Sequence, residues 1–230
     1  MPIYLHELVD VVPGRAGEYC DSMAEHHGAS AARAGRTDGM LGLWTSIEAA
    51  GTWPLGVNIW QYGSWSGVEA QLGRQFEPRA QDPKLKAWWL ANLGLRTGGF
   101  DRLIESTDYT LDVEGLRRRG AAGTLFLHQI VSLSAGKVGD YLAAFGAEGT
   151  AAAEAHGATL VGAYRVLLRS DEAITLLAFS RPADFARFQK SWYDESTALG
   201  RWRQREDAWV RGKEALVLKP RYFLRSPWHP

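Results

Sequence analysis

The chain opens with a short apolar stretch, residues 3–9, which is followed by a proline–glycine turn. The same apolar pattern returns at residues 125–131, again ahead of a glycine turn. Three pairs of residues keep one constant offset of 122 positions: His6 and His128, Gly14 and Gly136, and Tyr19 and Tyr141. One offset shared by such different residue types indicates an internal duplication, so the chain is predicted to contain two halves of similar fold.

Within the first half, runs of apolar residues alternate with stretches of helical periodicity. Proline at position 83 and Ser64 are typical of helix starts, and glycines end the helices. The predicted strands are 3–12, 40–47, 56–62 and 100–111, and the predicted helices are 15–34, 65–76 and 82–93. The second half repeats this order, with strands at 125–133, 159–169, 173–180 and 213–219 and helices at 137–156, 182–195 and 199–211.

Each half therefore has the β-α-β-β-α-β order of a ferredoxin-like unit. Strands such as 125–131 are apolar on both faces, so the sheet face that the helices leave open needs a partner. The other half supplies it. We predict an α+β fold in which two ferredoxin-like repeats, 1–111 and 124–230, pack sheet to sheet as a pseudo-symmetric barrel, joined by a polar linker at 112–123.

Composition and charge narrow the class of protein. Of 230 residues, 46% are hydrophobic and 23% charged, as in a globular protein with a core. Lysine plus arginine equals aspartate plus glutamate, 26 each, so no net field favours nucleic acid or a membrane surface. The single cysteine, Cys20, fits a reducing compartment. Without a signal-peptide pattern or a long apolar run, a cytoplasmic protein is expected.

Aromatic residues are abundant, with ten tryptophans, eight tyrosines and eight phenylalanines. They either fill a bulky core or line a pocket for a flat apolar ligand. The candidates for binding such a ligand are Trp44, Trp60, Tyr62, Tyr164 and Trp65.

The polar residues of the repeated strand are the candidate catalytic groups: His6 and Glu7 in the first copy, and His128 and Gln129 in the second. Successive side chains on a strand point to opposite faces, so only one of each pair can face the barrel. Alignment on the Pro-Gly turn favours Leu5, Glu7 and Val9 inside. Glu7 among aromatic rings would have a raised pKa and act as a general base, or else pair with an arginine.

Other chemistry has weaker support. No spacing typical of a zinc site, a nucleotide-binding loop or a serine-hydrolase elbow occurs, so no metal is predicted. His26, His27 and His156 precede glycines at predicted helix ends, where histidines commonly cap the helix. His229 lies in the C-terminal tail.

Several short motifs resemble the NIPSNAP-like branch of the dimeric α/β-barrel superfamily. They are the opening strand with its Pro-Gly turn, Ile59-Trp60-Gln61-Tyr62 before a helix, Asp82-Pro83 opening the next helix, Leu218-Lys219-Pro220 and Ser226-Pro227-Trp228. That family usually has an arginine late in the first strand, where this chain has Glu7 and Gln129. Its arginine-based role therefore does not carry over. The resemblance implies the barrel fold and a wide choice of functions, among them cofactor-free oxygenases and haem enzymes.

Three hypotheses follow. The first is an enzyme without an organic cofactor that acts by acid–base chemistry on an apolar, aromatic or polycyclic small molecule, as an isomerase, cyclase, lyase or monooxygenase. The second is a haem-dependent protein with a histidine as axial ligand, and the third a non-catalytic binding or assembly protein. The first predicts that Glu7→Gln and His128→Ala fold normally and lose turnover. Whether the barrel forms a homodimer stays open.

Overall fold

The computed structural model describes residues 1–34, 39–47, 51–76 and 83–224. Three features named above lie outside the described residues: Asp82, the segment Ser226–Trp228 and His229. The side chains of His26 and His27 also fall outside the description, so their predicted capping role stays a prediction.

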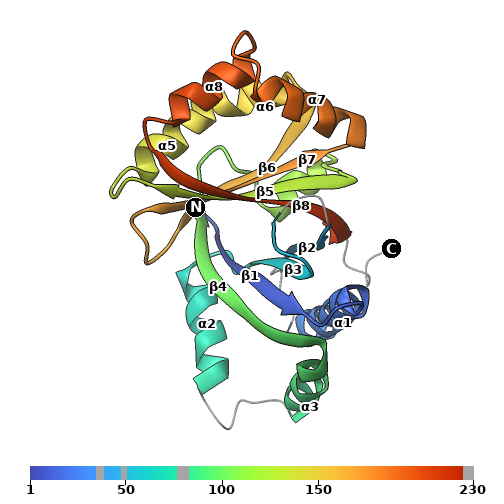
Figure 1. Ribbon diagram of the computed structural model, residues 1–230. Helices are drawn as coiled ribbons and strands as arrows, with labels where there is room; N and C mark the ends of the chain where they lie inside the picture. Colours follow the sequence, from blue (N-terminus) through green and yellow to red (C-terminus); the bar gives the residue numbers. More distant parts are fainter. Residues whose placement is uncertain (35–38, 48–50, 77–82, 225–230) are drawn as a thin grey trace.

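The two halves have the same succession of elements, drawn in Figure 1. The first half contains β1 (Ile3–Val11), α1 (Ala16–Ala34), β2 (Met40–Ser46), β3 (Leu55–Gln61), α2 (Trp65–Phe76), α3 (Pro83–Asn92), the 3-10 turn η2 (Leu93–Leu95) and β4 (Arg96–Ser106). The second contains β5 (Leu125–Leu133), α5 (Val138–Ala144), the π-helical turn η3 (Phe145–Gly149), α6 (Thr150–Glu154), β6 (Ala158–Val166), β7 (Glu172–Phe179), α7 (Pro182–Trp192), α8 (Ala198–Glu206) and β8 (Val210–Phe223).

The strands form one closed antiparallel barrel, in the order β1-β3-β2-β8-β5-β7-β6-β4. Within it, β4-β1-β3-β2 and β8-β5-β7-β6 are the same ferredoxin-like order read twice, and the pairs β2–β8 and β4–β6 join the two sheets. Helices α1 to α3 cover one side and α5 to α8 the other (Figure 1). The predicted α+β barrel of two repeats is confirmed.

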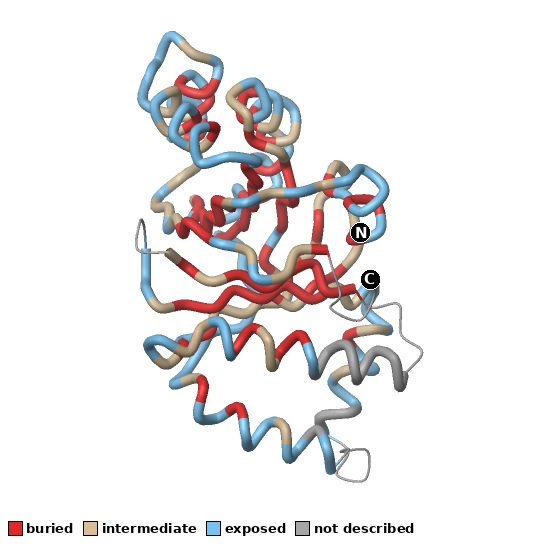
Figure 2. The backbone as a smooth tube through the Cα atoms, turned by 90° about the vertical axis from the view of Figure 1, so that its right-hand side faces the viewer, coloured by how far each residue is buried: buried red, intermediate tan, exposed pale blue. Residues whose placement is uncertain are grey.

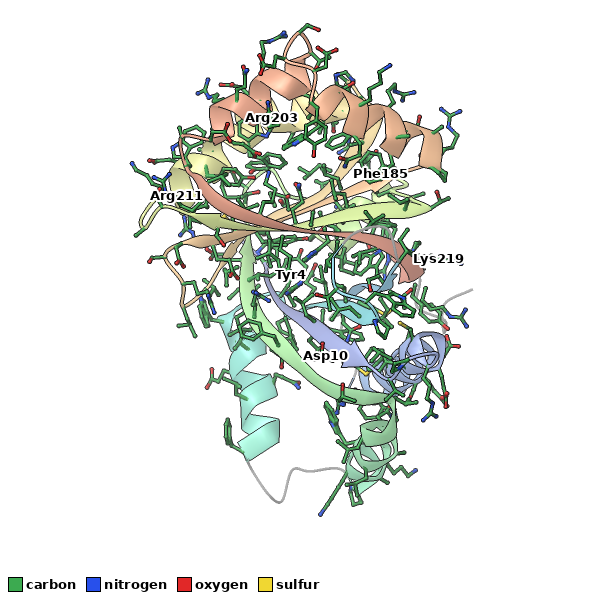
Figure 3. The ribbon with its side chains drawn as sticks, viewed as in Figure 1. Tyr4, Asp10, Phe185, Arg203, Arg211 and Lys219 are labelled. Carbon is green, nitrogen blue, oxygen red and sulfur yellow. The ribbon has the colours of Figure 1, made fainter. Side chains whose placement is uncertain are left out.

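The core consists of a central cluster between the sheets and one cluster under each helix layer. Buried positions accordingly concentrate on the strands (Figure 2). Figure 3 shows the layers through single residues, with Tyr4 between the two sheets and Phe185 between α7 and its sheet. We call the space between the two sheets the lumen.

Matching glycines make room for large rings in the lumen. Trp44 folds back over Gly42 on β2, and Tyr164 folds over Gly162 on β6, so a methyl group on either glycine would overlap the ring. Because both rings are fully buried, they cannot move aside without opening the core.

We therefore expect Gly42→Ala to destabilise the protein by about 1–3 kcal/mol, measured by chemical denaturation. Gly73→Ala on α2 is the control, since a methyl group there meets open space and alanine favours a helix by up to about 1 kcal/mol. Equal stability of the two variants would contradict the close fit of Trp44 over Gly42.

The predicted polar linker is partly helical. Residues Val113–Arg118 form α4, capped by the Asp112 carboxylate, which accepts a hydrogen bond from the Gly115 N–H at 2.7 Å. Val113 and Leu116 are buried in the lumen cluster. Two apolar residues at helical spacing were enough to fold the segment onto the barrel, although its arginines and glycines had favoured a loop.

Several boundaries differ from the sequence prediction. Strand β4 ends at Ser106 and not at 111, and β8 runs over Val210–Phe223 and not over 213–219. Two further differences have a local cause. Strand β4 begins at Arg96 and includes Gly98 and Gly99. Both glycines pair in register with β1, because backbone hydrogen bonds between strands do not require side chains. The predicted helix 137–156 is interrupted by the π-helical turn η3, where Gly146 lies against the Tyr109 ring.

Candidate active site

The residues of β1 divide between two environments. Tyr4 and His6 lie in the lumen, whereas Val9 joins the cluster beneath α1 and Glu7 bonds to residues of that layer. The expectation that Glu7 and Gln129 face the lumen is therefore wrong. Alternation along the strand allows either His6 or Glu7 to face the lumen. Because both faces of the strand are apolar, alignment on the turn could not decide which of them does.

His6 and His128 meet in the lumen, where the pseudo-twofold arrangement of the two halves brings these equivalent residues together. Their Nε2 atoms are 2.9 Å apart and both side chains are fully buried. The rings are parallel within 2°, with centroids 5.0 Å apart. Since the nitrogens are far closer than the centroids, the rings meet edge to edge in an N–H···N hydrogen bond. One imidazole donates and the other accepts, so the accepting ring is neutral.

Electrostatics keep this pair uncharged. Burial, then the neighbouring histidine and Arg102, lower the pKa of His6 well below its ordinary value. Burial and Arg102 lower the pKa of His128 to about 3. Arg102 on β4 lies opposite His6 in the register of β1 and β4. Its side chain donates a hydrogen bond to Glu172 on β7 at 2.5 Å. This ion pair links the two halves beside the histidines.

The histidine pair does not fit an axial ligand for haem or a shared metal site. Each Nε2 is used by the other ring, and 2.9 Å leaves no space for an ion between them. Large side chains, including Tyr4, Trp44 and Tyr164, fill the surrounding lumen. Among the described residues, no group of three or more histidine, cysteine, aspartate or glutamate side chains is arranged to hold a metal.

Glu7 occupies a different site, between the first sheet and its helices. Its Oε2 accepts hydrogen bonds from the Asn58 amide at 3.1 Å and from the Trp60 indole. The same Asn58 amide donates to the Tyr19 hydroxyl on α1 at 2.6 Å. Strand β3 supplies Asn58 opposite Glu7, and α1 supplies Tyr19, so three elements fix the carboxyl group. We call Glu7, Asn58, Trp60 and Tyr19 the carboxyl site.

Burial raises the pKa of Glu7 above its ordinary value, against the opposing effect of the Trp60 and Asn58 hydrogen bonds. Asp101, directly opposite Glu7 on β4, raises it further, and Arg96 lowers it. Desolvation also raises the pKa of Asp101. The Glu7 carboxyl is thus placed to change protonation state at a higher pH than an exposed glutamate, which suits a general base.

The second half has an amide, Gln129, at the position that corresponds to Glu7. Gln129 also faces the helices, but its Oε1 accepts from Thr175 at 3.2 Å and it is buried. Tyr141, the counterpart of Tyr19, is packed against Phe145 and Trp202. The Gln129 amide cannot take up a proton, and it is buried, so its role is to stabilise the packing of the second half.

The five predicted ligand-binding aromatics are divided between the layers. Trp44 and Tyr164 are fully buried in the lumen, where they pack on Phe126 and Tyr4. Trp60 and Tyr62 belong to the layer beneath α1, where Trp60 contacts Glu7, and Trp65 is exposed on α2. The structure therefore brings only the last three to the side of the first sheet on which Glu7 lies.

Sequence reasoning missed Asn58, Tyr19, Asp101 and Arg96 as parts of this site. Asn58 could have been noticed, because asparagine is uncommon inside an apolar strand. The positions of Asp101 and Arg96 depend on the register of β4 against β1, which no local pattern gives.

His156 lies just after α6 and is half-buried, at the helix end where the sequence placed it.

In the part of the chain that the structure describes, no helix combines the length and apolar character that a membrane span requires.

Comparison with known proteins gives a match in structure and none in sequence. No family model and no curated protein matches the chain. An anthrone oxidase-like protein superposes with a TM-score of 0.64 at 12% identity, over 96% of this chain and 92% of that one. A protein described as a candidate monooxygenase from Fusobacterium nucleatum gives 0.62 at 10% identity, over 95% and 92%. A candidate chlorite dismutase gives 0.52 at 13%, over 96% and 95%.

These likenesses establish the fold. The chain has the dimeric α/β-barrel fold, with both halves in one polypeptide. At such low identity no activity is transferred, and the NIPSNAP-like resemblance stays a prediction.

Proposed function

We propose that this protein is an enzyme without an organic cofactor that removes a proton from an acidic carbon of an apolar, aromatic substrate. Glu7 is the general base. The observation that carries the proposal is the half-buried Glu7 carboxyl, held through Oε2 by Trp60 and Asn58. Among the described residues Oε1 accepts no hydrogen bond, so it is the oxygen left to receive the proton.

The surroundings favour a carbon acid over a polar substrate. Trp60, Tyr62 and Trp88 give this layer an aromatic lining. Proton transfer from carbon to Glu7 leaves a carbanion that a conjugated carbonyl group stabilises as an enolate. The Asn58 amide and the Tyr19 hydroxyl lie within one or two hydrogen bonds of the base and fix its orientation.

The names of the structural neighbours support oxygen as the second reactant. Dioxygen can add to the carbanion, and loss of water then converts a methylene group into a carbonyl. One oxygen atom stays on the carbon and the other leaves as water, so no external reductant is needed.

Anthrone, which has one acidic methylene group beside aromatic rings, is a suitable probe. In deuterated buffer without oxygen, we expect the protein to speed hydrogen–deuterium exchange at that methylene, followed by proton NMR. In air, we expect oxygen uptake to match loss of anthrone. Exchange at the buffer rate, or a haem absorption band in the active protein, would contradict a cofactor-free base at this site.

A further inference from the structure

The internal duplication allows each position around Glu7 to be compared with its counterpart in the second half. On the helix-facing side, Leu127 of β5 and Val217 of β8 are each 3% exposed. Their counterparts in the first half, Leu5 of β1 and Leu103 of β4, hold the same register but are only half-buried. The same sheet face is therefore closed in one half and partly open in the other.

The helix that follows the third strand also differs between the two halves. In α7, Phe185, Phe188 and Trp192 form an apolar stripe that packs on its sheet through Phe179. The corresponding helix α2 has an apolar stripe too, made of Trp65, Val68, Leu72 and Phe76, at spacings of three and four residues that place them on one side of the helix.

Most of the α2 stripe is uncovered. Among the described residues of α2, Val68 alone is buried, whereas Leu72 is 45% and Trp65 58% exposed. Because Val68 points toward the protein body, Trp65 and Leu72 on the same side of the helix border the space beside it. Exposed apolar side chains aligned in this way indicate a surface made for burial against a partner.

We infer that the substrate of the proposed reaction occupies the space between the α2 stripe and the half-open sheet face of Leu5 and Leu103, and that α2 becomes covered when it binds. In the second half the aromatic side chains of α7 fill the corresponding layer. A flat apolar molecule takes their place in the first half, with its acidic carbon at Glu7. This inference rests on the proposed function for its choice of occupant.

The length of the stripe sets the class of molecule. Residues 65 and 76 are about 16 Å apart along the helix at ~1.5 Å per residue, which is longer than a single aromatic ring. The rim of the site is charged, since Arg96 lies over the Trp89 ring, 3.8 Å from its centroid, and Asp101 is exposed beside Glu7. A molecule of several fused rings with a polar group at one edge fits this distribution.

The test uses a dye, 1-anilinonaphthalene-8-sulfonate, which is aromatic, carries one anionic group and fluoresces in apolar sites. We expect one dye per chain, and about tenfold weaker binding to Leu72→Ser because an apolar contact is lost. Leu168→Ser is the matched control, since Leu168 is 96% exposed on a turn of the second half. Hydrogen exchange should show new protection of α2 amides with the dye and unchanged protection in α7.

Glu7→Gln separates this inference from the proposed reaction, because the dye has no proton to give. If Glu7→Gln binds the dye but anthrone exchange is absent in every variant, the reaction fails and the binding site stands. Unchanged dye binding in Leu72→Ser would overturn the inference. Protection of α2 that rises with protein concentration in the absence of dye would also overturn it, since a second copy of the chain would then cover the stripe.

Discussion

Replacing Glu7 by glutamine is expected to reduce proton abstraction from anthrone by about 10²- to 10⁴-fold while leaving the fold intact. The glutamine side chain has nearly the same shape and can still accept from Trp60 and Asn58 through its amide oxygen, but it cannot take up a proton. The measurement is the deuterium exchange rate of the anthrone methylene, with circular dichroism to compare folding. Retention of the full rate would remove Glu7 from the mechanism.

The second half provides the control. Gln129 holds the position equivalent to Glu7, bonded to Thr175, and Gln129→Asn should leave the exchange rate within about twofold, a difference of under 1 kcal/mol.

The exchange rate of the anthrone methylene should also depend on pH in a defined direction. Because the pKa of Glu7 is raised, the base is protonated and inactive at low pH, and the rising limb of the profile should lie above the ordinary pKa of 4.5. A limb at or below 4.5 would indicate a solvent-exposed carboxylate as the base.

Much of the fold could be predicted because it depends on patterns within the chain. The offset that joins His6 with His128 also joins Tyr19 with Tyr141, and both pairs occupy equivalent places in the structure. The apolar character of both faces of β5 indicated a sheet covered on two sides, and the closed barrel provides that cover.

The site could be predicted only in part, for a reason that lies in strand geometry. Local sequence shows that His6 and Glu7 point in opposite directions, but not which one faces the lumen. That choice is made by long-range partners: Asn58 and Tyr19 receive Glu7 on one side, and His128 receives His6 on the other. The partial exposure of Leu5 could not be predicted from the sequence either. Helices α2 and α7 both have apolar stripes, and only the structure shows which stripe is packed against its sheet.

The structure changes the expectation for the histidines, from loss of turnover in a folded protein to loss of stability. We expect His128→Leu to lower the free energy of unfolding by about 1–3 kcal/mol, because Nε2 of His6 is left buried without its partner. The reverse variant, His6→Leu, should cost a similar amount. The double variant should recover most of the loss, since no imidazole then stays unpaired, and denaturation of all four proteins gives the coupling directly. Additive losses would show that the N–H···N bond contributes nothing to stability.

The same pair should make the protein sensitive to acid, in a direction fixed by its lowered pKa values. As pH falls below the ordinary histidine pKa of 6.5, the unfolded chain binds protons, while both buried histidines resist protonation because their pKa values are lowered, that of His128 to about 3. Unfolding is therefore favoured progressively between these values, by up to one proton for each histidine. The double leucine variant lacks both groups, so its stability should fall less steeply over the same range. Parallel stability–pH curves for the two proteins would mean that the imidazoles are charged in the folded state, which the Arg102 guanidinium beside them opposes.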